Sequence, residues 1–116
     1  MIVVDSSALI AVLLEEPERQ AFQDIIDSDE RCVLSAVNAH ETACVLRGRH
    51  GVAAVARFWQ WLIDNEIEIV PFDETQVRAA AGAFDCYGKG IDPKARLNLA
   101  DCAAYALAST MNCPVE

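Results

Sequence analysis

Short apolar runs alternate along the chain with longer segments in which apolar residues recur every three or four positions. A short apolar run bounded by turn residues predicts a buried strand, and helical spacing over a longer segment predicts an amphipathic helix. The apolar runs predict strands over residues 2–5, 31–35 and 67–71. The helical spacing predicts helices over residues 6–14, 17–28, 36–51, 52–65, 74–87 and 98–111, with a loop over 88–96.

Several of these boundaries carry local signals. Ser6 or Ser7 is expected to cap the first helix, and Pro17 stands at the first position of the second helix, where proline is favoured. Pro71 closes the third strand, because proline lacks the N–H that a central strand needs. Residues 113–115 are expected to begin a fourth strand that the chain hardly completes.

The alternation of strands with helices defines the expected fold class. Strand–helix–strand units favour right-handed crossovers, which place the strands in a mainly parallel sheet with helices on both faces. With 116 residues, the chain is long enough for one domain, spanning residues 1–116. We therefore expect a single α/β domain with ligands gathering at the carboxyl ends of its strands.

Composition excludes some protein classes. The hydrophobic content of 53% is ample for a core, and no run of 18 apolar residues predicts a membrane span. The N-terminal run lacks the basic start of a signal peptide and contains Asp5. The five cysteines are odd in number and form no CxxC pair, which favours free, buried thiols in a reducing cytoplasm.

Charge is unevenly distributed along an acidic chain. The net charge of −9 disfavours nonspecific binding of nucleic acid. Basic residues nevertheless gather at residues 47–57 and 89–96, and two such clusters could hold a polyanion locally. From charge alone, ordinary solvated faces are the simpler interpretation of both clusters.

Three acidic residues stand where a parallel sheet would bind a ligand. Asp5 is the last residue of the first predicted strand, and Glu41 and Asp101 each lie three residues after an asparagine near a helix start. An asparagine followed by such an acid resembles a capping box, and acids in a first turn also gain from the helix dipole. Each acid taken singly is therefore explained by helix capping.

The surroundings of Asp101 favour a second role. It is the only charged residue in LNLADCAAYALA (97–108), where Leu99, Cys102, Ala103, Ala106 and Leu107 form a continuous helical stripe. A helix that is apolar nearly all round is normally buried, and a buried carboxylate needs compensation. A divalent cation shared with Asp5 and Glu41 would supply it, and oxygen ligands favour Mg²⁺ or Mn²⁺.

Three stretches, IVVDSSALIAVLLEEPE, LSAVNAHETACVL and ARLNLADCAAYALA, occur in this order and spacing over essentially the whole chain. Together they resemble the PIN-domain ribonucleases of the VapC toxin type, from bacterial toxin–antitoxin pairs. The resemblance implies a PIN-like three-layer α/β/α fold with a mainly parallel central sheet.

The resemblance also implies an activity and a site. The family's acids fall on Asp5, Glu41 and Asp101, which would hold Mg²⁺ or Mn²⁺ for RNA hydrolysis, and its hydroxyl falls on Ser6, as a support of the ligands or as a helix cap. RNA contacts are then expected from the basic clusters. The residues concerned are Arg47, Arg49, Lys94 and Arg96. The implied partners are a VapB-like antitoxin and a second copy of the chain.

Two departures from the family pattern leave an alternative open. Ala100 stands where the family usually has glycine, and the family's C-terminal strand and fourth acid would lie beyond Glu116. We therefore expect that strand to be missing, and a catalytically impaired module that binds an antitoxin is the alternative function. A phosphoacceptor receiver domain is disfavoured, because it needs adjacent acids after the first strand, where this chain has Asp5-Ser6-Ser7.

Overall fold

The computed structural model describes residues 1–15, 19–28 and 30–115. The chain order of its elements is β1 (Ile2–Val4), α1 (Ser6–Leu13), α2 (Arg19–Ile26), β2 (Cys32–Ser35), α3 (Ala36–His50), α4 (Val52–Asp64), β3 (Glu68–Val70), α5 (Glu74–Tyr87) and α6 (Leu99–Met111). Each predicted helix and the first three predicted strands are present, α5 with the predicted bounds and the others with slightly shorter ones. The predicted helix start at Pro17 lies outside the described residues.

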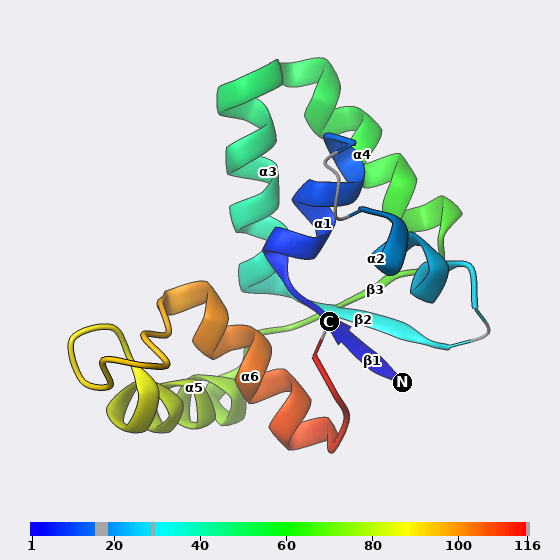
Figure 1. The fold of residues 1–116 in the computed structure, drawn as a ribbon. Helices are drawn as coiled ribbons and strands as arrows, with labels where there is room; N and C mark the ends of the chain where they lie inside the picture. Colours follow the sequence, from blue (N-terminus) through cyan, green and yellow to red (C-terminus); the bar gives the residue numbers. More distant parts are fainter. Residues whose placement is uncertain (16–18, 29, 116) are drawn as a thin grey trace.

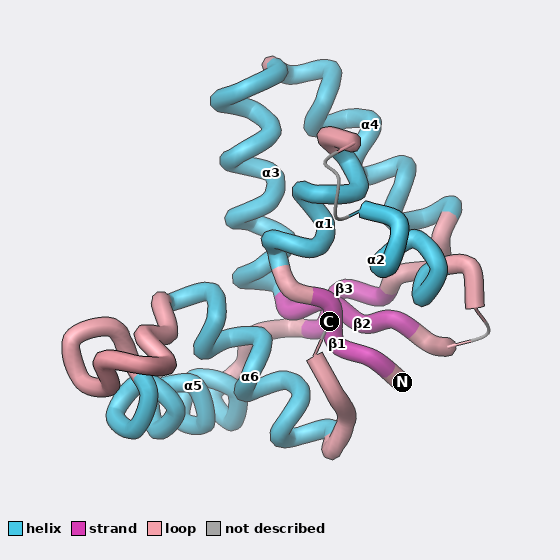
Figure 2. Tube along the Cα trace, in the orientation of Figure 1, coloured by secondary structure: helices cyan, strands magenta, loops and turns pink. Residues whose placement is uncertain are grey.

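The strands form one parallel sheet in the order β1-β2-β3. Val3 pairs with Val33, and Val33 in turn pairs with Glu68, so β2 is the central strand. Figure 2 shows the strands side by side with helices on both sides. The expected three-layer α/β/α arrangement is confirmed.

Alternating residues of the strands feed two separate cores, because successive side chains of a strand point to opposite faces. Val4 and Leu34 pack with Leu9, Leu46 and Phe58 of the α1, α3 and α4 layer. On the other face, a second core joins the sheet to α6; its buried members are Val3, Val33, Ala104, Leu107 and Ala108. The helices α5 and α6 thus form a layer of their own (Figure 1).

The C-terminal residues meet the outer edge of β1. Val115 makes a parallel bridge with Val3, whose N–H donates to the carbonyl of Pro114 at 2.9 Å. Residues 113–115 therefore begin a fourth strand beside β1, as predicted, and in the described residues that strand amounts to a single bridge.

The helix caps differ from the predicted ones at two places. Asp5 caps α1 in place of Ser6 or Ser7, and Ser35 caps α3 with its hydroxyl accepting the N–H of Val37 at 3.3 Å. Both strands pass directly into helices: Ser35 is the last residue of β2, and Asp5 is the residue between β1 and α1. Asn38 is therefore inside α3, and the predicted capping pair of Asn38 with Glu41 is wrong.

The prediction of buried thiols is partly wrong. Cys32 and Cys102 are buried, whereas Cys44 and Cys86 are exposed because they face outward from α3 and α5. In the described part of the chain, none of the helices is both long and apolar enough to cross a membrane.

Candidate active site

Asp5 lies at the carboxyl end of β1 and is half-buried. Its Oδ1 accepts the N–H of Ala8 at 2.9 Å and the hydroxyl of Ser7 at 2.8 Å. This N-cap interaction fixes the carboxylate at the start of α1. The sequence-based alternative that Asp5 caps a helix is thus confirmed.

Asp101 forms a complete capping box with Asn98 at the start of α6. Its N–H donates to Asn98 Oδ1 at 2.8 Å, and its own Oδ2 accepts the N–H of Asn98 at 3.0 Å. The carboxylate is exposed, so the prediction of a buried charge is wrong. Leu99 is likewise 81% exposed, whereas Ala100 and Cys102 in the same turn are buried, so Asp101 and Leu99 lie on the outward side of the helix start.

Glu41 is the acid that capping does not explain. Because α3 begins at Ala36, Glu41 lies in its second turn, not in the first turn as predicted. Its side chain is half-buried, and burial raises the pKa of its carboxyl group, with further increases from the nearby charges of Asp101 and Asp5. The three predicted acids therefore face a common region, close enough for their charges to interact.

A buried hydrogen-bond network lies directly behind these acids. The side chain of Asn38 donates to Ser6 Oγ at 2.9 Å and to the carbonyl of Ala100 at 3.2 Å. The Ser6 hydroxyl donates to the Asn38 carbonyl at 3.4 Å, and that carbonyl also accepts the hydroxyl of Thr42 at 2.8 Å. From the sequence, Asn38 was considered only as a helix cap.

The donor chemistry of the three acids fits a hard divalent cation. Carboxylate oxygens suit Mg²⁺ and Mn²⁺, and a cation would offset the repulsion that raises the pKa of Glu41. Over the described ranges, no group of three His, Cys, Asp or Glu side chains is gathered tightly enough to hold a metal. Repulsion between the negative charges of the three acids favours their separation in the absence of a cation. Mg²⁺ is commonly bound through one or two carboxylates together with water.

The neighbouring thiol of Cys102 does not offer a second chemistry. It is 3% exposed, and burial raises its pKa, with a further increase from the charge of Asp101. A thiol with a raised pKa stays protonated and is a poor nucleophile. The carboxylates are therefore the reactive groups of this region.

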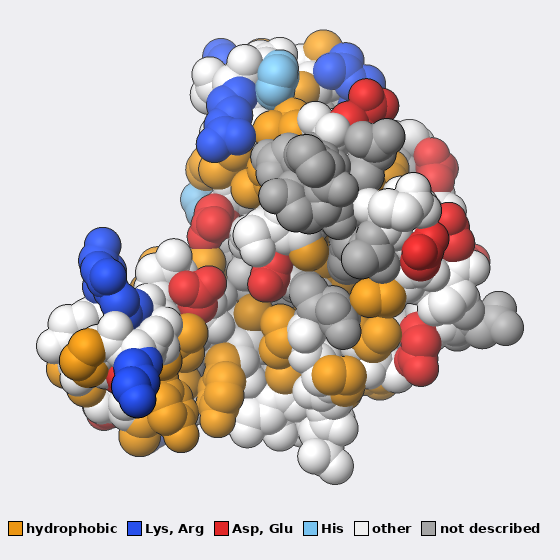
Figure 3. Space-filling model, in the orientation of Figure 1, with side chains coloured by type: hydrophobic (Ala, Val, Ile, Leu, Met, Phe, Trp, Pro, Cys, Tyr) orange, Lys and Arg blue, Asp and Glu red, His pale blue; other side chains and the backbone are white. Residues whose placement is uncertain are grey.

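Basic side chains gather on two sides of the acidic region. Arg47 and Arg49 are exposed in the last turn of α3, and Lys94 and Arg96 are exposed in the loop that joins α5 to α6. Figure 3 shows blue side chains over these two places with red side chains between them. The predicted basic clusters thus flank the acids in space, although they are far apart in sequence.

The loop between α5 and α6 has a defined conformation. Gly88 and Leu97 form a parallel bridge, and the Asp92 carboxylate accepts the N–H of Lys94 at 2.8 Å. A Cβ atom at position 88 would lie 2.5 Å from the carbonyl oxygen of Phe84, so glycine is required there. The loop therefore holds its basic residues at the rim of the acidic region.

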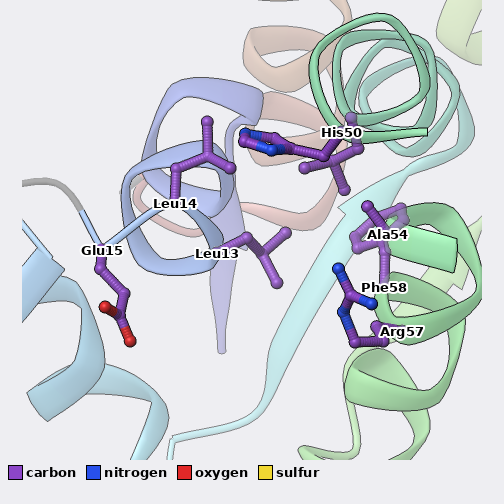
Figure 4. Close-up of a pocket in the computed structure, with 8 residues that line it drawn as sticks. Leu13, Leu14, Glu15, His50, Ala54, Arg57 and Phe58 are labelled. Carbon is purple, nitrogen blue, oxygen red and sulfur yellow. The ribbon is translucent and has the colours of Figure 1, made fainter.

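The surface has one hollow beside the start of α6 and another farther from the acids. An apolar hollow of about 400 Å³ adjoins the start of α6 and is lined by Phe72, Val77 and Phe84 together with the exposed Leu99. A second cavity of about 290 Å³ lies between the end of α1 and the α3–α4 hairpin (Figure 4). Figure 4 shows the Arg57 guanidinium on its α4 side. Neither is lined by Asp5, Glu41 or Asp101.

We expect the substitution Glu41→Gln to stabilise the protein at pH 7 in the absence of divalent cations. The raised pKa means that the folded state holds the Glu41 proton more tightly than the unfolded state. Its destabilising effect is absent below the ordinary glutamate pKa and develops as the pH rises through the raised value. The melting temperature should therefore rise at pH 7.

Circular dichroism melts at pH 4 and pH 7 in EDTA would test this expectation. The difference between Glu41→Gln and the wild-type protein should nearly vanish at pH 4, where both side chains are neutral. The matched control is Asp64→Asn, which neutralises an exposed acid at the end of α4. Equal melting temperatures at pH 7, or a stabilisation that persists at pH 4, would contradict the expectation.

Comparison with known proteins gives a consistent result. Residues 2–115 match the family model described as PIN domain. The chain is 34% identical to ribonuclease VapC30 of Mycobacterium tuberculosis over 113 residues, which cover 97% of this chain and 86% of that protein.

Two solved structures share the fold. The crystal structure of Mycobacterium tuberculosis VapC20, a sarcin-ricin loop cleaving toxin, matches with a TM-score of 0.77 at 15% identity, covering 97% of this chain and 85% of that one. A chain of a toxin–antitoxin complex from Klebsiella pneumoniae matches with a TM-score of 0.71 at 16% identity, covering 99% and 83%.

Proposed function

Because the chain belongs to the VapC family of PIN-domain ribonucleases, we propose that it is a metal-dependent endoribonuclease toxin. It hydrolyses phosphodiester bonds of RNA in the cytoplasm and is neutralised by a cognate antitoxin. The observation that supports the proposal is the raised pKa of Glu41 on α3, to which the charges of Asp101 and Asp5, at the starts of α6 and α1, both contribute.

Asp5, Glu41 and Asp101 are the residues that would hold Mg²⁺ or Mn²⁺. When bound, such a cation lowers the pKa of water and neutralises charge on the leaving oxygen. Asp5 and Asp101 are each oriented by a capping hydrogen bond to one carboxylate oxygen. Glu41 lies in the second turn of α3, beyond the helix cap, so its carboxylate would be left to hold the cation or to orient a water molecule.

We propose that RNA lies across the acids and contacts the basic residues on both sides. Arg47 and Arg49 would bind phosphates beyond one side, and Lys94 and Arg96 beyond the other. In EDTA, Lys94→Glu should weaken RNA binding about fivefold to tenfold at low salt and lower the salt slope by about one. The control Arg31→Glu, at the amino end of β2, should bind RNA like the wild-type protein, and equal losses in both variants would contradict this path.

A VapB-like antitoxin and a second copy of the chain are the proposed protein partners. The solved toxin–antitoxin complex of the same fold supports an antitoxin. The described surface carries an apolar groove of about 640 Å³ between α3 and α4, lined by Ala43, Val52, Val55 and Trp59 among others. A second apolar surface surrounds Leu99, so two separate areas are suited to protein contacts.

Removal of the metal tests the proposed reaction. Purified protein is incubated with RNA in Mg²⁺ or Mn²⁺, in EDTA, and in EDTA followed by excess Mn²⁺. We expect cleavage with either cation, loss of cleavage in EDTA, and recovery on addition of Mn²⁺. Cleavage that is unaffected by EDTA would contradict the proposal.

The cleavage assay, together with growth on expression, distinguishes the proposed ribonuclease from the alternative of an impaired antitoxin-binding module. Such a module would cleave no RNA with either cation, and its expression would not arrest growth. Growth arrest that requires Asp5 would support the ribonuclease, because an inactive site cannot cause it.

A further inference from the structure

Asn38 connects the starts of three helices through one buried side chain. It is 1% exposed, and its Nδ2 donates to Ser6 Oγ of α1 at 2.9 Å and to the Ala100 carbonyl of α6 at 3.2 Å. The residue itself belongs to the first turns of α3. Figure 1 shows α1 and α3 on one side of the sheet and α6 on the other, so this side chain links the two layers.

The orientation of the Asn38 amide is determined by its partners. A carbonyl oxygen only accepts hydrogen bonds, so the Ala100 carbonyl requires the NH₂ group of Asn38 and excludes the flipped amide. The Ser6 hydroxyl accepts a hydrogen bond from the same NH₂ group and donates one to the Asn38 backbone carbonyl. The hydroxyl is thus used both as a donor and as an acceptor. The connection is therefore directional and specific for an amide.

Each partner of Asn38 is next to one of the acids. Ser6 follows Asp5, and Ala100 precedes Asp101. Glu41 lies one helical turn after Asn38 on α3. The backbone hydrogen bonds of the sheet join β1 to β2 but do not reach the start of α6. The Asn38 side chain thus supplies a direct polar contact between the Asp101 turn and the turns that carry Asp5 and Glu41.

The Asn38 amide also has a destabilising feature. Asn38 Oδ1 is buried and has no hydrogen-bond partner in the described part of the chain, and a buried acceptor without a partner is unfavourable. A leucine of similar size would avoid this cost. The two hydrogen bonds of Nδ2 are what the amide supplies instead.

We propose that Asn38 is a positioning residue that sets the separation of Asp5, Glu41 and Asp101 and thereby the affinity of the site for a divalent cation. This inference rests on the proposed metal-dependent function. Asn38 acts through the backbone of its neighbours and touches none of the reacting atoms.

Gln76 is a matched control elsewhere in the fold. It is also a buried amide with an unpartnered oxygen among the described residues, and its Nε2 donates to Thr110 Oγ1 at 2.6 Å. This contact joins α5 to the C-terminal end of α6, nine residues from Asp101 and therefore about 13 Å along the helix. Loss of Gln76 removes a buried amide without changing a contact next to the acids.

The test measures Mn²⁺ binding and thermal unfolding of Asn38→Leu and Gln76→Leu. Free Mn²⁺ is followed by electron paramagnetic resonance, with no RNA present. We expect Mn²⁺ affinity to fall about 10-fold to 100-fold in Asn38→Leu and by less than about twofold in Gln76→Leu. The melting temperatures of the two variants should change by similar amounts. A general loss of stability would then not explain a loss of Mn²⁺ affinity that occurs only in Asn38→Leu.

A second variant keeps the test decisive if Asn38→Leu does not fold. Ser6→Ala removes one contact of the Asn38 amide and leaves the other, so Mn²⁺ affinity should fall by about threefold to tenfold. Wild-type affinity in every folded variant at these two positions would overturn the inference. A wild-type protein whose Mn²⁺ binding is unchanged by Asp5→Asn would overturn the proposed metal site itself, and the inference with it.

Discussion

Asp101→Asn is expected to reduce Mn²⁺-dependent cleavage of RNA by about 100-fold or more while leaving the fold intact. The substitution removes one negative charge and one anionic oxygen from the proposed metal site. It keeps an oxygen that can accept the N–H of Asn98, so the capping box of α6 survives. Cleavage rates and melting temperatures of both proteins, measured in the same buffer, check this expectation.

Asp5→Asn follows the same logic at the start of α1. Asparagine is as good an N-cap as aspartate, so the hydrogen bond from Ala8 is retained while the charge is lost. We expect a similar loss of cleavage. Asp64→Asn, at the end of α4, serves as the control for removal of an exposed negative charge. Equal activity of Asp5→Asn, Asp101→Asn and the wild-type protein would refute the assignment of both acids.

Phe58→Ala is expected to cause the largest loss of stability. Phe58 is fully buried in the core that joins α1, α3 and α4 to the sheet, beside Leu9 and Leu34. Truncation of a buried phenylalanine leaves a cavity and costs about 3–5 kcal/mol. Small domains are stable by only about 5–15 kcal/mol, so the melting temperature should fall by roughly 10–25 °C.

Ile63→Ala on the same helix is the control for Phe58→Ala. Ile63 is 69% exposed, so its truncation should change the free energy of unfolding by no more than about 0.5 kcal/mol. Urea denaturation of both variants measures these changes. Comparable losses at the two positions would mean that α4 packs on the sheet through a different face.

The fold could be predicted well because its signals are local. The apolar runs around Val3 and Val33 are short and bounded by polar residues, which distinguishes strands from the helical spacing around them. The carboxyl-end placement of Asp5 also follows from the parallel sheet alone. Such patterns depend on neighbouring residues and need no knowledge of distant contacts.

The environments of the candidate acids were predicted less well than the fold. Asp101 was expected to be buried because its helix is apolar nearly all round, yet it lies on the outward side of α6 with the exposed Leu99 and Tyr105. Glu41 was expected to be a capping acid, yet Ser35 starts α3 three residues earlier than Asn38. Both errors concern burial and helix starts, which depend on how separate elements pack.

The sequence by itself determined the order of elements, the α/β class, the place of Asp5 at the end of the first strand and the place of Asp101 at the start of the last helix. Only the tertiary structure decided which polar groups meet. Residues 5, 41 and 101 are far apart in the chain, and the charge effect on Glu41 exists only because three helix starts converge. The Asn38 contact with Ala100 spans 62 residues, and no local pattern encodes a hydrogen bond that forms only when two layers of helices close on the sheet.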